Sequence, residues 1–404
     1  TGTVFKAART TRLIVDTADR KCQRGLAEAV REYRHGLAFG FSEGEVAEQV
    51  ANIRRDVENN AVSADTRSHV ALLGSVWALL REDTVPSDPE SVRQRFESFA
   101  PAITPDAVIA ALRREAVPLD RPLLRFRGRY APEGGEKALR RAWDAAMKER
   151  LQRPEINEAT AFAYNDFGAA GAVASDTREA ALGIRTVRFA NGVRLNVKRT
   201  ALEQGRVRVR LNLDGGQMLN TPENPLATQL VPFLPSGGLG RHSRDELQSI
   251  MAGRSVGWRF SAADTVFTST AQTTPGDLEL QLQLMAAFLT DPGYRPEGVT
   301  EYRHFINSYF KQMDATPAGK LAARIGGILS NDDPRFSLQP VESYRALTFD
   351  KLAHDIGGRL GSGAIEIGIV GDIDEDEAIA LVARTFGALP DREADFRNHA
   401  ADQP

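Results

Sequence analysis

The apolar positions of the first 152 residues recur at helical spacing. The clearest run follows Ser42 and Glu45, a pair typical of a capping box. Its apolar members lie three or four residues apart, on one face of a helix: Val46, Val50, Ile53 and Val57. Thr104 followed by Pro105 predicts another helix start. We therefore expect residues 1–152 to be mainly helical, with one short strand at 123–126.

The pattern changes at residue 153. The run Phe167-Gly168-Ala169-Ala170-Gly171-Ala172 consists of small residues with little periodicity. Such a run buries little apolar surface, so it does not form a core element by itself. We interpret residues 153–183 as a linker that crosses between two domains.

Apolar and polar residues alternate from residue 184 onward. Asn191-Gly192 lies between two alternating segments and predicts a β-hairpin, because a type I′ turn needs positive φ at both central residues. Farther on, Arg206, Arg208 and Arg210 alternate with aliphatic residues, which places these arginines on one face of a sheet. We interpret this basic face as a solvated or interdomain face and not as a ligand site.

Strand and helix patterns then interleave up to residue 390. A second hairpin is predicted around Ala263-Asp264, and a clear strand at 365–369. Ser243 and Glu246 predict a capping box, and Thr274-Pro275 another helix start. The order is not a regular βαβ alternation. It predicts an α+β domain over residues 184–404, with a mostly antiparallel sheet packed against helices.

Composition narrows the classes of partner. The 404 residues, enough for two or three domains, include 51 basic and 54 acidic side chains, a net charge of −3. A nucleic-acid-binding protein would favour a basic excess, so we expect no nucleic-acid partner. No apolar run reaches the roughly 18 residues of a membrane span. Cys22 is the only cysteine, which excludes an internal disulfide.

A search for catalytic chemistry finds no self-sufficient active site. None of the six histidines has the short spacing of a zinc motif, and no cysteine pair exists. His242 and Glu246 stand four residues apart, but the capping box explains Glu246 without a metal. The chain alone is therefore expected to hold no metal and no catalytic residue.

Three signatures, in order over about 200 residues, carry a family resemblance. They are the hairpin segment 187–195, the run Leu234-Pro235-Ser236-Gly237-Gly238, and the strand segment 367–374 followed by Phe386-Gly387-Ala388-Leu389-Pro390. Together they resemble one repeat of the pitrilysin/insulinase-type zinc peptidases, which have metallopeptidase (LuxS/MPP-like) repeats. Residues 1–152 resemble the helical later part of a preceding repeat, with Gly40-Phe41-Ser42-Glu43-Gly44-Glu45 as a helix-start signature.

In this family the catalytic repeat carries H-x-x-E-H on a helix, with two zinc-binding histidines and a glutamate base. In this chain the resemblance places those positions at residues that offer neither an imidazole nor a carboxylate: Thr228, Val231 and Pro232. Where the family has its third ligand, this chain has Asn307 and Ser308, while Glu301 lies too near the helix start to substitute. The resemblance thus implies a degenerate, non-catalytic repeat.

By resemblance, the chain is the non-catalytic portion of a zinc metalloendopeptidase that degrades peptides in a closed chamber. It would be an excised internal piece that contributes chamber wall and substrate positioning. Its expected partners are the peptide substrate and a missing zinc-bearing half, with zinc in the full-length protein and no cofactor here. Bacterial relatives suggest a periplasmic location.

Two alternatives remain. One is an inactive homologue that acts as a scaffold or partner subunit, like the core subunits of respiratory complexes. The other is an unrelated α+β binding protein. An H-x-x-E-H motif within the about 300 residues expected upstream would separate the peptidase from the scaffold.

Overall fold

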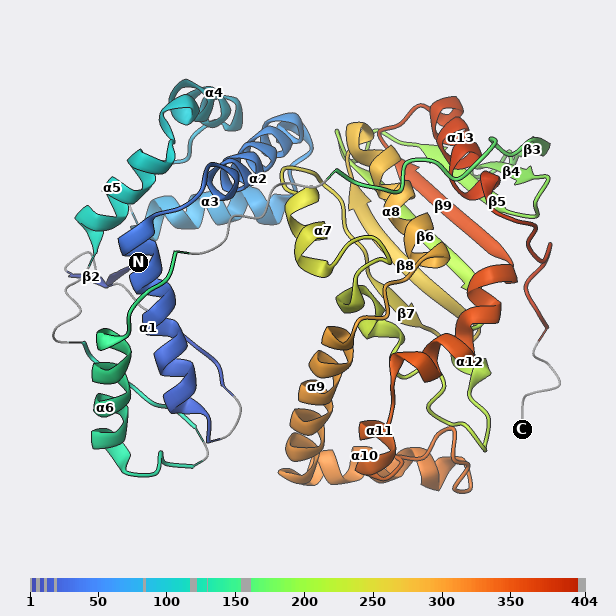
Figure 1. The fold of residues 1–404 in the computed structure, drawn as a ribbon. Coiled ribbons are helices and arrows are strands. Elements are labelled where there is room, and N and C mark those ends of the chain that lie inside the picture. Colours follow the sequence, from blue (N-terminus) through green and yellow to red (C-terminus); the bar gives the residue numbers. More distant parts are fainter. Residues whose placement is uncertain are drawn as a thin grey trace. The chain divides into compact units, whose positions relative to one another are not determined.

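The computed structural model describes residues 2–4, 8–10, 13–17, 20–82, 85–116, 122–128, 130–153 and 161–398. The chain forms two compact units (Figure 1). One comprises Thr1–Arg54 with Gln94–Glu158, and the other Arg55–Arg93 with Ala159–Pro404.

The first unit is built mainly from helices. These include α1 (Cys22–Phe39), the first part of α2 (Glu43–Val62), most of α4 (Pro89–Phe99), η2 (Ala100–Ala102), α5 (Pro105–Glu115) and α6 (Gly135–Lys148); β1 (Gly2–Val4) pairs with β2 (Ala8–Thr10). Helices α1 and α6 pack together around a small core cluster of Val30, Trp143 and Ala146. Ser42 and Glu45 form the expected reciprocal cap.

The strand predicted at 123–126 is wrong: these residues have no regular secondary structure. A strand is stabilised by hydrogen bonds to a neighbouring strand. In the described part of this unit, no strand pairs with this segment. Its apolar pattern is therefore left without a sheet to join.

The second unit begins with a helical portion, η1 (Ala64–Thr66) and α3 (His69–Glu82). Large apolar side chains of α3 are exposed on several sides of the helix, Val70 by 80% and Leu80 by 69%. The Asn59 amide donates to Ser255 Oγ at 2.8 Å, and the Gln204 N–H donates to Thr66 Oγ1 at 3.2 Å. These contacts join the end of α2 and η1 to the larger portion of the unit.

A seven-stranded sheet forms the centre of the second unit. Its members are β3 (Val173–Arg178), β4 (Arg185–Phe189), β5 (Arg194–Arg199), β6 (Val207–Asp214), β7 (Phe260–Ala262), β8 (Val266–Thr273) and β9 (Ile365–Gly371). The strand order is β3-β4-β5-β9-β6-β8-β7. Only the pair β5–β9 is parallel. The predicted α+β fold with a mostly antiparallel sheet is confirmed.

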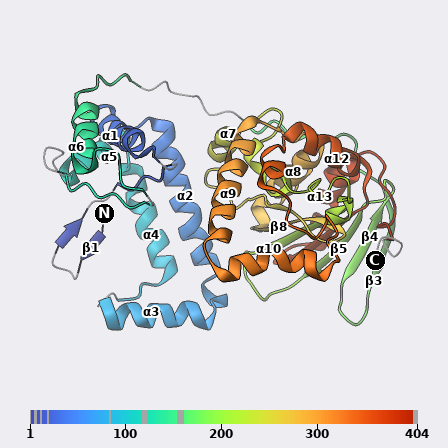
Figure 2. The ribbon, with the colours of Figure 1, turned by 90° about the horizontal axis from the view of Figure 1, so that it is seen from below.

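Three helices cover one face of this sheet (Figures 1 and 2). They are α8 (Leu278–Thr290), α12 (Phe349–Ser362) and α13 (Glu375–Arg384). Between them and the sheet lies the main core, which includes Leu211, Leu282 and Ile367, each 0% exposed. In β6 the burial alternates along the strand, so the opposite sheet face carries the polar side chains.

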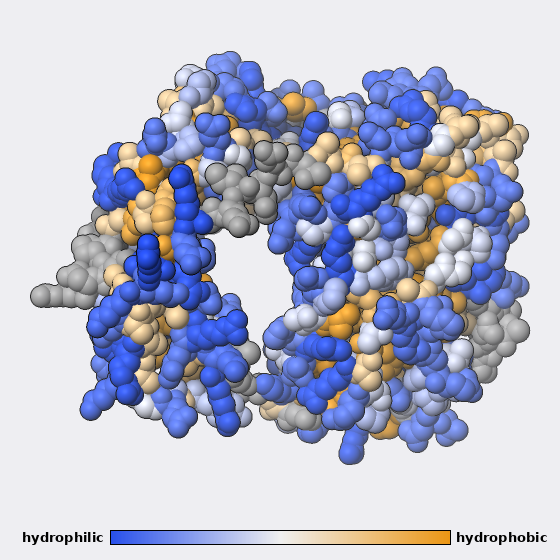
Figure 3. Space-filling view, viewed as in Figure 1, coloured by the Kyte–Doolittle hydropathy of each residue, from blue (hydrophilic) through white to orange (hydrophobic). Residues whose placement is uncertain are grey.

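The remaining elements of the unit are η3 (Gly216–Leu219), η4 (Val231–Gly237), α7 (Arg244–Ile250), η5 (Pro275–Asp277), α9 (Pro296–Asp314), α10 (Pro317–Leu329), α11 (Val341–Arg345) and η6 (Phe386–Ala388). Helix α9 packs on η4 and contacts α10 and α11. In Figure 3, hydrophilic side chains dominate the surface of this unit, with apolar patches among them. Within the described residues, no helix is both long and apolar enough to cross a membrane.

Both predicted hairpins are confirmed. Strands β4 and β5 pair antiparallel across Asn191-Gly192, with Gly192 at φ 91°. Asn191 does not have a positive φ, so the expected type I′ turn is wrong although the hairpin forms. The Asn191 amide also donates to the carbonyls of Phe386 and Leu389, at 2.9 and 3.0 Å. The turn is thereby tied to the end of the domain. Strands β7 and β8 form the second hairpin.

The segment expected to be a linker differs from that interpretation over its described part, 161–183. Residues 173–178 are strand β3, the edge of the sheet. Tyr164 is only 8% exposed and packs with Phe162 and the apolar side chains of α7 and α8. Aromatic side chains that precede the small-residue run hold the segment against the domain.

Candidate functional site

The positions of the degenerate zinc motif lie between β6 and α7, where the chain forms turns and short 3₁₀ segments. Thr228 precedes η4, and Val231 and Pro232 are its first two residues. Pro232 and Pro235 both lack the backbone N–H that an α-helix interior needs. The chain therefore has no α-helix here on which residues three and four apart could share a face.

The side chains at these positions cannot act as metal ligands. Thr228 is 5% exposed, and its hydroxyl and its backbone N–H both lie 3.2 Å from Asn220 Oδ1. Val231 is fully buried in the main core, and Pro232 is exposed. None carries an imidazole, thiolate or carboxylate, the groups that bind zinc in proteins. This donor set does not fit zinc.

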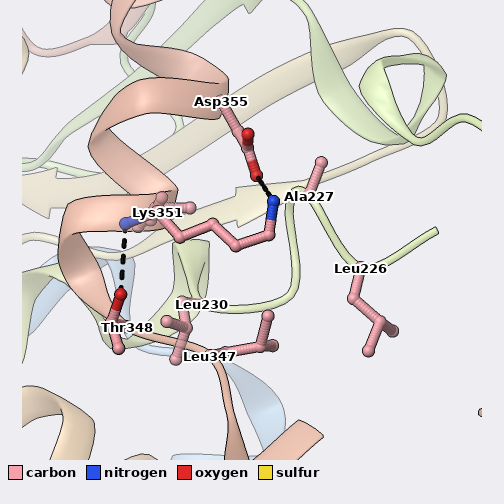
Figure 4. A pocket seen from close by; sticks show the side chains of 8 residues that line it. Leu226, Ala227, Leu230, Leu347, Thr348, Lys351 and Asp355 are labelled. Carbon is pink, nitrogen blue, oxygen red and sulfur yellow. Dashed lines mark hydrogen bonds and ion pairs between the residues drawn. The ribbon is translucent and has the colours of Figure 1, made fainter. Parts of the chain in front are cut away.

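A shallow depression lies beside these residues (Figure 4). It is lined by Leu226, Ala227, Leu230, Leu347, Thr348, Lys351, Leu352 and Asp355 and has no space for a water molecule. The Asp355 carboxylate accepts from Lys351 Nζ at 2.9 Å and from Asn224 Nδ2 at 3.0 Å. Its charge is thus compensated within the fold, and the lining offers no free base.

The residues at the family's third-ligand positions are also engaged or turned away. Asn307 Oδ1 accepts from Arg345 Nε at 3.0 Å and Nη2 at 2.8 Å. Ser308 is exposed, and Glu301 forms an ion pair with Arg244 at 2.6 Å. Nowhere in the described ranges do three His, Cys, Asp or Glu side chains come close enough together to hold a metal ion.

His242 has a structural role that the sequence did not reveal. It is 1% exposed, and its Nε2 accepts from the backbone N–H of Ala163 at 2.9 Å. Phe162 stacks on its ring. Burial lowers the pKa of His242, so the neutral imidazole is favoured. The predicted capping box is confirmed, since Glu246 Oε2 accepts from Ser243 N at 2.6 Å.

Tyr164 completes the attachment of this segment. Its hydroxyl donates to Asp291 Oδ2 at 2.6 Å and accepts from the Arg241 backbone N–H at 2.8 Å. Burial, together with the hydrogen bond to Asp291, raises the pKa of Tyr164 to about 12. His242 and Tyr164 both attach this segment to the domain through hydrogen bonds. Their spacing in the sequence forms no recognisable catalytic motif.

Comparison with known proteins identifies the architecture. No family model matches the sequence. The chain is 22% identical over 211 residues to the chloroplastic stromal processing peptidase of Arabidopsis thaliana, covering 51% of this chain and 17% of that protein. A mutant of the ferredoxin protease FusC, solved in complex with Arabidopsis ferredoxin, superimposes with a TM-score of 0.53 at 14% identity.

The periplasmic protease PqqL from Escherichia coli superimposes equally well, with a TM-score of 0.53 at 16% identity. The chain has the fold of a pitrilysin/insulinase-type peptidase. Each superposition covers 94% of this chain but 42% of the other. The chain therefore spans less than half the length of either peptidase. The family resemblance drawn from the three sequence signatures is confirmed.

Proposed function

We propose that this chain is the non-catalytic portion of a zinc metalloendopeptidase that degrades peptides in a closed chamber. Its role is to form chamber wall and to position the substrate. The observation that carries this proposal is that the zinc-motif positions lie in, or just before, a proline-containing 3₁₀ segment, on a fold shared with FusC and PqqL. Zinc and the catalytic residues would belong to another part of the full-length protein.

A wall of this kind acts through binding geometry. Holding an extended substrate in one place lowers the entropic cost of reaching the reactive arrangement. Exclusion of bulk water strengthens the polar interactions made inside a chamber. Neither contribution needs a titrating group on this chain. A periplasmic location is part of the proposal, supported by the likeness to PqqL, itself a periplasmic protease.

The test compares the full-length protein with this chain. The full-length protein should hydrolyse peptides, lose activity with a chelator and regain it with zinc. The purified chain should show no hydrolysis and no stoichiometric zinc by metal analysis. Tight zinc on this chain would contradict the proposal. Absence of an upstream H-x-x-E-H, with an inactive full-length protein, would favour the inactive scaffold or partner subunit instead.

A further inference from the structure

The sheet face opposite α8, α12 and α13 is strongly basic. We call it the open face. Burial of the alternate residues in β4, β5, β6 and β9 assigns to it the remaining side chains of these strands. Its charged members are Arg188, Arg194, Lys198, Arg208, Arg210, Glu366 and, buried at the end of β6, Asp214. Five cations therefore share this face with two carboxylates.

The arrangement of these cations is not what fold stability would favour. Arg188 and Arg194 are direct cross-strand partners, and like charges directly opposite one another destabilise a sheet. Lys198 and Arg208 both pair with Val370, one from each side of β9. The two strands that flank β9, β5 and β6, thus both carry positive charge on this face.

The carboxylates that compensate this charge lie around the centre of the open face. Asp395 is 3.2 Å from Arg194 and 3.5 Å from Arg188, and Glu203 is 2.8 Å from Arg208. Arg210 is exposed, and its guanidinium donates to Asn212 Oδ1 at 3.1 Å. No carboxylate among residues 161–398 forms an ion pair with Arg210. The centre of the face therefore holds an available cation.

The surface beside Arg210 is also open to a ligand backbone. Its cross-strand neighbour on β9 is Gly368, which in turn pairs with Asn196 on β5. A Cβ built on Gly368 would meet no atom within 4 Å. One position without a side chain thus lies between Arg210 and Asn196. The main chain of a ligand can approach the sheet there, with its side chains reaching the flanking groups.

We propose that the open face binds an acidic, extended segment of the polypeptide substrate, with Arg210 as its main contact and Arg208, which Glu203 holds beside it, as a neighbouring cation. Guanidinium groups bind carboxylates through paired N–H donors, and five cations on one face attract several carboxylates at once. The net charge of −3 on the whole chain disfavours a long nucleic acid as the occupant. The inference rests on the proposed function and deepens it by naming the substrate class.

The experiment measures binding to the complete chain by fluorescence anisotropy. The probes are a labelled peptide rich in Asp and Glu and its counterpart with Asn and Gln. The acidic peptide should bind at least about tenfold more tightly, and added salt should weaken its binding. The double variant Arg208→Gln/Arg210→Gln should bind it at least about fivefold more weakly. The matched control, Arg303→Gln/Arg384→Gln, removes two exposed cations of α9 and α13 and should change binding less than about twofold.

Equal binding of the two peptides, or an equal loss in both double variants, would overturn the inference. Tighter binding of single-stranded DNA than of the acidic peptide would also overturn it. Circular dichroism and the urea midpoint establish that each variant folds. If the full-length protein hydrolyses peptides without any dependence on Arg208 and Arg210, only this inference fails. If acidic peptides bind but the full-length protein has no activity, the proposed peptidase role fails instead.

Discussion

At the scale of single residues, Asp214 is the centre of a buried network of ion pairs in the second unit. It is 0% exposed and accepts from Arg359 Nη2 and from Arg397, whose Nε lies 2.6 Å away. Arg359 is bound in turn by Glu393, and these carboxylates raise the pKa of Arg359. The network ties the end of β6 to α12 and to the segment after residue 390.

Asp214→Asn should therefore lower the free energy of unfolding by about 3 kcal/mol, because it removes the buried anion that Arg359 and Arg397 share. Urea denaturation followed by circular dichroism measures this loss. Glu366→Gln is the matched control, since Glu366 pairs with Arg194 on the open face, and it should cost less than about 1 kcal/mol. Equal losses in the two variants would show that the Asp214 network adds nothing.

His242 predicts a dependence of stability on pH. Its folded-state pKa lies below 6.5, so the unfolded chain binds a proton that the folded chain excludes. Its contribution to stability is complete above pH 6.5. It should fall as the pH decreases below 6.5, until the folded-state pKa is reached. The measurement compares urea midpoints at neutral and mildly acidic pH for the native chain and for His242→Gln, in which this contribution should be absent.

Residue-level roles were only partly predictable. The inability of Thr228, Val231 and Pro232 to bind zinc follows from their chemistry, and stays a prediction for the chain in solution. The attachment of residues 161–164 by His242 was not predictable, because the partners are 79 residues apart in the chain. A hydrogen bond to a backbone N–H leaves no trace in the spacing of side chains.

At the scale of elements, β9 is the central strand that joins the two halves of the sheet. Its Ile367 is fully buried, while Val370 of the same strand is 41% exposed on the open face. Ile367→Ala should cost about 3 kcal/mol of unfolding free energy through lost burial and a cavity. Val370→Ala, the same-strand control, should cost less than about 1 kcal/mol. Similar values would mean that the open face is covered in solution.

Helices and strands were predicted correctly where the signal lies in neighbouring residues, and less well where it depends on a distant partner. Caps and hairpins depend on neighbouring residues, as at Ser243 and Asn191, and these were correct. Strand β3 was missed because all six of its residues are exposed, so the edge strand has no alternation of apolar residues. The opposite holds for residues 123–126. They have the apolar pattern of a strand, but no described strand pairs with them.

At the scale of the whole molecule, the two units differ in the size of their cores. The principal cluster of the first unit contains Val30, Trp143 and Ala146, whereas the second unit has a continuous core between its sheet and helices. A chain cut to residues 159–404 should therefore keep a cooperative urea transition, while residues 1–158 alone should show weak protection from amide hydrogen exchange. Strong protection in the shorter piece would contradict this expectation.

The place of β9 in the sheet has a consequence for biosynthesis. Strand β9 inserts between β5 and β6, and Arg194 of β5 is paired with Glu366, 172 residues later in the chain. During translation, hairpin β4–β5 and the group β6–β8–β7 leave the ribosome long before β9 does. Each half-sheet then presents an unpaired edge, which favours association with other chains. Nascent chains should consequently depend on chaperones until about residue 371 has emerged.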